Sequence, residues 1–319
     1  MKTQNGKLLL VMLVVVVWVS GLQLGSAQTF QNVPVNGGAS LTQLSAGGTS
    51  IWALDTAGQP YIYQAGGFVA AGNLSLAQIA VAGGNSVQVD EVWGLDSSGQ
   101  IYVGSPSDSG WQFFQVPGLL AQIAVGAGYS KCYPYEVWGI SASNQIYRFN
   151  HCNQQFEQIP GLLTRLTVGG GAIWGIDSSN HIFRFDSPSQ TFKQVPGRLI
   201  QVTVGVDGVW GINSSGYVYQ FDPATQRFVQ LPGVLSRIAA GGNGVWGLTA
   251  RGAIYRFDPS AQRFVSVPGV LAQIAVGYGG GVWGINASRQ AYAFHSTGTA
   301  HPQDRKGLPE WPPDPCIRQ

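Results

Sequence analysis

A short phrase built on tryptophan recurs seven times along the chain, and its spacing constrains the possible folds more than any other feature. The phrase reads "GVWGIN" around its fifth copy, and its tryptophans are Trp52, Trp93, Trp138, Trp174, Trp210, Trp246 and Trp283. The middle four stand 36 residues apart, and a Pro-Gly phrase repeats at the same interval at Pro160, Pro196, Pro232 and Pro268. Two markers with one period define a structural repeat.

Each repeat contains short runs in which apolar and polar residues alternate, bounded by Gly, Pro, Asn and Asp, as in "YVYQFD" and "RFVQLPG". Such runs are typical of short β-strands. About four strands account for one repeat, so we expect each repeat to be a four-stranded antiparallel blade. A single blade leaves apolar faces and strand edges exposed, and radial stacking into a β-propeller covers both.

The two ends of the repeat region predict a closed ring. Residues 30–34 and 41–48 provide the second half of a repeat, whereas 282–294 provide only the first half. Joined, they complete a seventh blade, in agreement with the seven tryptophan phrases. We therefore predict an all-β propeller of seven blades, the last closed by N- and C-terminal strands.

The first 27 residues resemble a secretory signal. Lys2 and Lys7 precede the apolar run 8–19, and small residues Gly25 and Ala27 follow it. The apolar run is shorter than the roughly 20 residues that span a bilayer, which disfavours the alternative of a signal anchor. We expect cleavage after Ala27, a propeller over 28–295, a Pro-rich tail over 296–319, no membrane span after cleavage, and a secreted or periplasmic protein.

Composition and cysteine placement limit the partners. Only 10% of the residues are charged, the net charge is +2, and no long basic stripe is present, so nucleic acid is not expected as a partner. Cys132 and Cys152 flank two neighbouring strands of one repeat, and a disulfide between them suits an exported protein; two free thiols are the alternative. Cys316 is left over.

Catalytic motifs are absent from the sequence. The four histidines have no His or Cys partner at metal-ligand spacing, and no nucleophile elbow, P-loop or EF-hand loop occurs. We expect no enzymatic activity, no metal and no cofactor. A hydrolase or lyase with a site assembled in the central channel is left as an alternative, because a linear sequence would hide it.

Polar residues that recur in register beside aromatic residues suggest carbohydrate binding, since sugars offer hydroxyl groups to polar side chains and apolar C–H faces to aromatic rings. Each type also has a structural explanation: tryptophans pack between blades, Asp and Asn form turns, and arginines solvate the surface. The ligand-binding candidates are the seven tryptophans with Asp96, Asp177, Asn213, Asn286, Arg148, Arg184 and Arg256.

The phrases "LPGVLSRIAAGGNGVWGLTARGAIYRFD" and "VPGVLAQIAVGYGGGVWGIN" resemble tectonin repeats, as found in tectonins, fish-egg lectins and the horseshoe-crab lipopolysaccharide-binding tachylectin. The resemblance covers about residues 30–294. It implies a lectin for lipopolysaccharide, GlcNAc-type or O-methylated sugars, although other tectonin-repeat proteins are protein-interaction platforms. Well-known lectin members have six blades, which makes six the alternative count.

Carried over by motif, the resemblance places the turn Asp or Asn at Asp55, Asp96, Asp177, Asn213 and Asn286, and the strand arginine at Arg148, Arg184 and Arg256. The hypothesis that follows is a secreted, multivalent, glycan-binding propeller. A propeller scaffold for a protein partner is the alternative.

Overall fold

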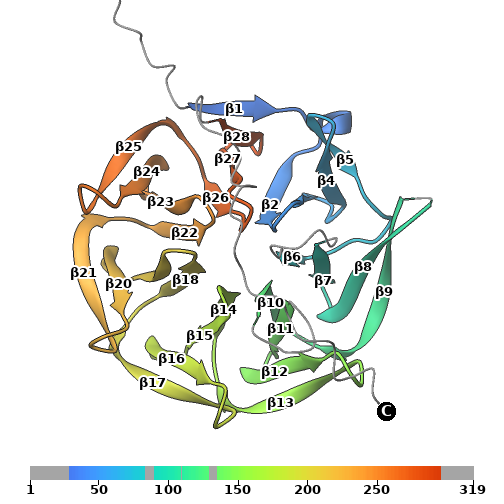
Figure 1. The fold of residues 1–319 in the computed structure, drawn as a ribbon. Helices are drawn as coiled ribbons and strands as arrows, with labels where there is room; N and C mark the ends of the chain where they lie inside the picture. Colours follow the sequence, from blue (N-terminus) through green and yellow to red (C-terminus); the bar gives the residue numbers. More distant parts are fainter. Residues whose placement is uncertain (1–28, 83–89, 109, 129–134, 296–319) are drawn as a thin grey trace, which may run out of the picture.

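The computed structural model describes residues 29–82, 90–108, 110–128 and 135–295, which form a ring of seven four-stranded antiparallel sheets (Figure 1). The predicted all-β propeller with seven blades is thereby confirmed. The expected signal segment, the tail, Cys132 and Cys316 lie outside the described residues.

Each blade runs outward from an innermost strand at the central channel to an outermost strand at the rim. The first three blades are β2 (Leu41–Ala46), β3 (Ile51–Asp55), β4 (Pro60–Gln64) and β5 (Gly67–Ala70); β6 (Gln78–Ala82), β7 (Glu91–Leu95), β8 (Gln100–Ser107) and β9 (Gly110–Leu119); and β10 (Gln122–Ala127), β11 (Tyr135–Ile140), β12 (Gln145–Asn150) and β13 (Gln155–Leu162). The fourth and fifth are β14 (Arg165–Gly169), β15 (Ala172–Ile176), β16 (His181–Asp186) and β17 (Thr191–Arg198); and β18 (Gln201–Gly205), β19 (Gly208–Ile212), β20 (Tyr217–Asp222) and β21 (Arg227–Val234). The sixth is β22 (Arg237–Gly241), β23 (Gly244–Leu248), β24 (Ala253–Asp258) and β25 (Arg263–Val270), and the seventh is β26 (Gln273–Val276), β27 (Val282–Ile285), β28 (Ala291–His295) and β1 (Thr29–Val33).

The ring closes where β1 pairs with β28 in an antiparallel register from Thr29 opposite His295 to Val33 opposite Ala291. The N-terminal end thus contributes one outermost strand to the seventh blade, followed by a short 3-10 turn, η1 (Asn36–Gly38). The expectation that 41–48 also belongs to this blade is wrong, because β2 is the innermost strand of the first blade. The period of a repeat sets its length but not the strand at which a blade begins.

The hydrophobic core is divided into seven clusters, each lying between two neighbouring blades. Between the fifth and sixth blades, for example, Trp210 and Ile212 pack against Leu235, Ile238 and Phe257. Because every blade buries one face against the preceding blade and the other against the next, no blade holds its core alone.

Glutamine side chains at the start of the innermost strands link the blades around the channel. Gln122 donates from Nε2 to the carbonyl oxygen of Leu166 (3.0 Å) and accepts at Oε1 from the Leu166 N–H (3.1 Å). Gln43, Gln78 and Gln201 make the same pair of bonds to Ile79, Ile123 and Ile238. Gln273 accepts from the Leu44 N–H, so the series continues across the closure of the ring. We call this paired contact the glutamine clamp.

Glycines at the other end of the innermost strands bring neighbouring blades close together. A Cβ atom added to Gly126 would lie 2.4 Å from the Val168 carbonyl oxygen, and one added to Gly241 would lie 2.6 Å from that of Val276. These distances leave no room for a side chain, which explains why glycine recurs at this position in most repeats.

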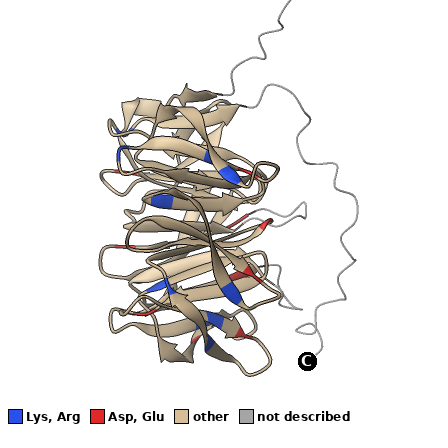
Figure 2. Ribbon diagram, turned by 90° about the vertical axis from the view of Figure 1, so that its left-hand side faces the viewer, with Lys and Arg blue, Asp and Glu red and all other residues tan. Residues whose placement is uncertain are grey.

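Charged residues are few and scattered over the side of the ring (Figure 2). None of the helical segments in the described ranges is long and apolar enough to cross a membrane.

Candidate functional site

The seven tryptophans lie buried between blades, each on the second strand of its blade. Six are at most 1% exposed and Trp283 is 7% exposed. The Trp210 ring meets the Phe257 ring of the next blade edge-on at 4.6 Å between centroids, and Trp174 meets Phe221 in the same way at 4.8 Å. Such pairs contribute about 0.5–1.5 kcal/mol beyond their burial. The indoles are therefore engaged in blade packing, and none presents an open face to a ligand in this structure.

The three candidate arginines lie over these tryptophans. Arg148, Arg184 and Arg256 each stand directly opposite the tryptophan of their own blade on the neighbouring strand. Their guanidinium carbons lie 5.7, 5.9 and 5.6 Å from the centroids of Trp138, Trp174 and Trp246, a cation–π geometry. Arg148 is further bound to Glu136 by an ion pair, whereas Arg184 is exposed.

The candidate Asp and Asn residues begin the turn between the second and third strands. In each of Asp55, Asp96, Asp177 and Asn213, Oδ1 accepts hydrogen bonds from the backbone N–H groups two and four residues later, at 2.8–3.0 Å. Asn286 accepts only from the Gln290 N–H. One oxygen therefore holds the turn, and the second side-chain atom remains available for another partner.

That second atom meets a tyrosine in four blades. Asn213 Nδ2 lies 3.4 Å from the Tyr219 hydroxyl, Asn286 Nδ2 lies 3.4 Å from the Tyr292 hydroxyl, and the Tyr61 and Tyr102 hydroxyls lie 3.5 Å from Oδ2 of Asp55 and Asp96. We call this pair, a turn Asp or Asn with the tyrosine six residues later, the Asx–Tyr cluster. The fourth blade differs, because Phe183 replaces the tyrosine and the His181 ring contacts Asp177 at 2.9 Å instead.

In each Asx–Tyr cluster the tyrosine packs into the apolar cluster that its blade shares with the preceding blade. Tyr219 is half-buried and packs against the apolar cluster around Trp174 of the fourth blade. Its hydroxyl also donates to Oε1 of Gln230 on the outermost strand at 3.3 Å. Gln115 occupies the matching place in the second blade, where Gln115 and Tyr102 both donate to Gln100. The Asx–Tyr clusters thus combine an aromatic ring with amide, carboxylate and hydroxyl groups.

The structure separates the predicted candidates into two groups. Turn Asp and Asn residues lie beside tyrosines, and arginines lie beside tryptophans on the other face of the third strand. The sequence reasoning missed these tyrosines and their outer-strand partners as site residues. A tyrosine six residues after the turn position in six of seven repeats was the available signal.

The turn aspartates are the titratable groups of these clusters. Burial alone would raise the pKa of Asp177, but hydrogen bonds from the His181 ring and from the His181 and Ser179 N–H groups outweigh it and lower that pKa. Within the four described ranges, no three His, Cys, Asp or Glu side chains gather as metal ligands.

A family model for the tectonin domain matches residues 21–187 and 162–308. No curated protein matches the chain. Solved structures of similar fold include YCF48 bound to D1 peptide, at 13% identity and a TM-score of 0.63, over 87% of this chain and 98% of that one.

Two further propellers are similar in fold. The Neurospora crassa Pan2 WD40 domain has 13% identity and a TM-score of 0.61, over 82% of this chain and 91% of that one. Yeast RCC1 (Prp20), in its structure with Kap60, has 10% identity and a TM-score of 0.56, over 80% of this chain and 79% of that one. At these identities the likeness concerns the fold alone.

Proposed function

The chain belongs to the tectonin family, and on that premise we propose that it is a multivalent carbohydrate-binding protein whose sites are the Asx–Tyr clusters between its blades. The ligands are repetitive surface glycans, such as lipopolysaccharide or chains of GlcNAc or O-methylated sugars. We further propose that the protein is exported, as the apolar segment 8–19 and the pair Cys132 and Cys152 suggest, and that its function is binding rather than catalysis.

The observation that carries the proposal is the hydrogen-bonded chain of Asn213, Tyr219 and Gln230 at the boundary between two blades. An amide beside a phenol offers paired donors and acceptors for sugar hydroxyls, and the half-buried ring offers an apolar surface for the sugar's C–H face. These groups are held in place by the turn and by blade packing, so binding a ligand would order few side chains.

The Asx–Tyr cluster recurs around the ring, and this repetition supports binding to polymeric glycans. A shallow site for one monosaccharide typically has millimolar affinity, about 4 kcal/mol. Several such sites around one ring, facing a glycan with a repeating unit, raise the apparent affinity by about 10²–10⁴. A strongly charged or deep pocket is not needed for this kind of recognition.

The test removes only the tyrosine hydroxyls. A triple variant, Tyr102→Phe, Tyr219→Phe and Tyr292→Phe, places at three blades the residue that the fourth already carries as Phe183. We expect an almost unchanged melting temperature and binding to a polymeric glycan about tenfold weaker. Tyr63→Phe is the matched control, because the Tyr63 ring packs on Trp283 and its hydroxyl is not part of an Asx–Tyr cluster. If the triple variant binds the polymeric glycan as well as the wild type does, the Asx–Tyr clusters are not the glycan-binding sites.

Exposed aliphatic residues favour protein binding as a second candidate function. Leu119, Leu162, Val234 and Val270 follow the Pro-Gly phrase in four blades and are 58–64% exposed. YCF48 and RCC1 were solved with a peptide and a protein bound, respectively. A glycan array with the mature chain separates the candidates, since binding inhibited by a free monosaccharide supports the first and sugar-insensitive protein capture supports the second.

A further inference from the structure

Two blades depart from the glutamine clamp. The innermost strand begins with glutamine in four blades and carries Gln43 as its third residue in the first, but it begins with Arg165 in the fourth blade and Arg237 in the sixth. Arginine carries donors and no acceptor, so it cannot accept a hydrogen bond from the next blade as glutamine does. The exchange therefore removes the acceptor of the clamp and adds a positive charge at the channel.

Opposite Arg165, the next blade presents a backbone group without its usual partner. Val202 occupies the position that Leu166 and Ile238 occupy in their blades, where the N–H donates to a clamp glutamine at 3.1 and 3.2 Å. At Val202 the facing side chain is Arg165, and no acceptor is supplied. Because inner-strand edges carry unpaired N–H groups, the Val202 N–H is left open to a ligand.

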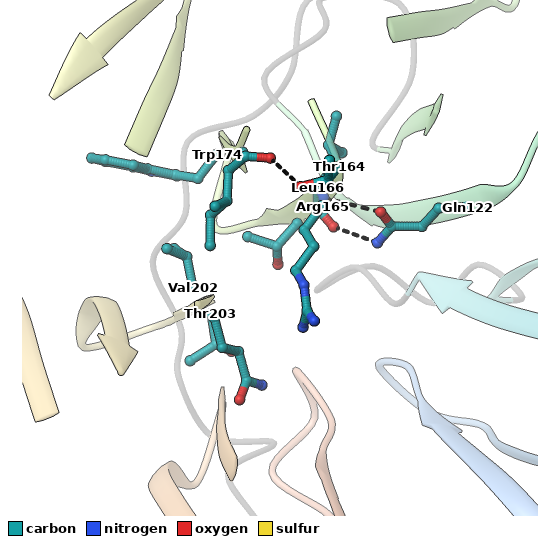
Figure 3. Close-up of a pocket in the computed structure, with 11 residues that line it drawn as sticks. Gln122, Thr164, Arg165, Leu166, Trp174, Val202 and Thr203 are labelled. Carbon is teal, nitrogen blue, oxygen red and sulfur yellow. Dashed lines mark hydrogen bonds between the residues drawn. The ribbon is translucent and has the colours of Figure 1, made fainter. Parts of the chain in front are cut away.

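A cavity of about 540 Å³ lies at this gap. Figure 3 shows the Arg165 side chain extending away from Gln122, which is held by two hydrogen bonds to Leu166. Thr167 and Thr203 also line the cavity. Within the described ranges, no carboxylate forms an ion pair with Arg165 and no hydrogen bond engages its side chain; the ion pairs there join Arg148 with Glu136, His181 with Asp177 and Lys193 with Asp186.

We propose that this gap is a binding site for an oxyanion of the size of phosphate, free or carried by a sugar or other small molecule. The guanidinium fork offers two parallel N–H donors, a geometry that matches phosphate oxygens. The Val202 N–H and the threonine hydroxyls add neutral donors around the same space. Arg165 is exposed at this gap, so a dissolved ligand can reach its guanidinium.

The site is distinct from the Asx–Tyr clusters proposed to bind glycans. It is lined by the innermost strands β14 and β18 and by Trp174, Gly175 and Ile176 of β15, and it uses none of the Asx–Tyr residues. Arg237, opposite Ile274, makes the same exchange in the sixth blade, but the cavity described here adjoins Arg165 and the proposal concerns that position.

Arg165→Gln is the informative variant, because glutamine at this position forms the clamp in other blades. The variant removes the charge and provides an acceptor for the Val202 N–H, so the fold is expected to be retained. Arg227→Gln on the exposed start of β21 is the matched control, since it removes the same charge far from the channel.

Calorimetric titrations of the full chain with sodium phosphate, glucose 6-phosphate and glucose, at constant ionic strength, test the proposal. We expect saturable millimolar binding of phosphate, at least tenfold weaker in Arg165→Gln and unchanged in Arg227→Gln. Tighter binding of glucose 6-phosphate than of phosphate would identify a sugar-borne anion, and equal binding a free oxyanion.

The proposal is overturned if neither phosphate nor glucose 6-phosphate binds saturably, or if both variants lose binding alike, which would indicate general charge attraction. It is equally overturned if glucose binds as tightly as glucose 6-phosphate and Arg165→Gln leaves both unchanged. Thermal melting of each variant verifies that the fold persists.

Discussion

Arg148 donates two hydrogen bonds of 2.9 Å, from Nε and Nη2, to the two carboxylate oxygens of Glu136 on the neighbouring strand. Glu136 is buried and also accepts from Nε1 of Trp138 at 3.1 Å. The pair therefore joins a charged side chain to the structural indole of the third blade. None of the other blades repeats it within the described ranges.

Breaking this pair on one side should be costly. Arg148→Val leaves the buried Glu136 without its cation, and we expect a loss of about 3 kcal/mol in the free energy of unfolding. Val103 stands at the equivalent place in the second blade, so valine fits the strand. Chemical denaturation of Arg148→Val, Glu136→Ala and the double variant gives the coupling energy. Additive losses would contradict a coupled pair.

Glu91 holds the place of Glu136 in the second blade, without an arginine across from it. Burial raises the pKa of Glu91 to about 7. In the unfolded chain a glutamate has a pKa near 4.3, so between about pH 4.3 and 7 the folded protein holds a proton that the unfolded chain has released. The contribution of Glu91 to stability is therefore fully present at low pH and is lost as pH rises through 7.

The prediction is a free energy of unfolding that falls between pH 5 and pH 8 by an amount on the order of 3 kcal/mol through this residue. Glu91→Gln keeps the shape without the titration and should remove that slope. Denaturation curves at several pH values for both proteins test it. An identical pH slope in the two proteins would assign the dependence to other groups.

The fold was predictable because the contacts that make it are repeated. A tryptophan such as Trp210 packs against an aromatic residue of the next blade, here Phe257. Each repeat contains both the tryptophan and the aromatic partner, so a single repeated sequence provides the two surfaces of every blade interface. The blade boundary was not predictable, since β2 could equally close one blade or open another. Only hydrogen bonding decides between them.

The candidate site was predictable in part. Asn213 was found from its recurrence, but its partners Tyr219 and Gln230 lie on two further strands, and only pairing registers bring them together. Arg165 is visible in the sequence as an exception to glutamine. The consequence of this exception could not be predicted, because the clamp glutamines bind backbone atoms of the next blade. A sequence pattern does not show which backbone atoms a side chain contacts.

A disulfide between Cys132 and Cys152 stays a prediction, since Cys132 lies outside the described residues. Cys152 lies in the turn after β12, and the neighbouring His151 hydrogen-bonds the backbone of Tyr135 at the start of β11. The turn and the start of β11 are therefore at the same end of the blade. Closing this loop should stabilise the fold by about 3 kcal/mol. Peptide mapping without reductant that finds both thiols free would disprove it.

Replacing a blade tryptophan separates packing from ligand contact. Trp210 is 1% exposed and its ring meets Phe257 and Phe264 of the next blade. Trp210→Ala should lower the free energy of unfolding by about 3–5 kcal/mol, because it leaves a cavity between two blades that β-sheet hydrogen bonds prevent from collapsing. The remaining folded protein should bind a polymeric glycan almost as well as the wild type, since the indole has no open face. Denaturation and polymer binding measured on one preparation decide the matter: a stable variant with lost glycan binding would show that Trp210 contacts the sugar.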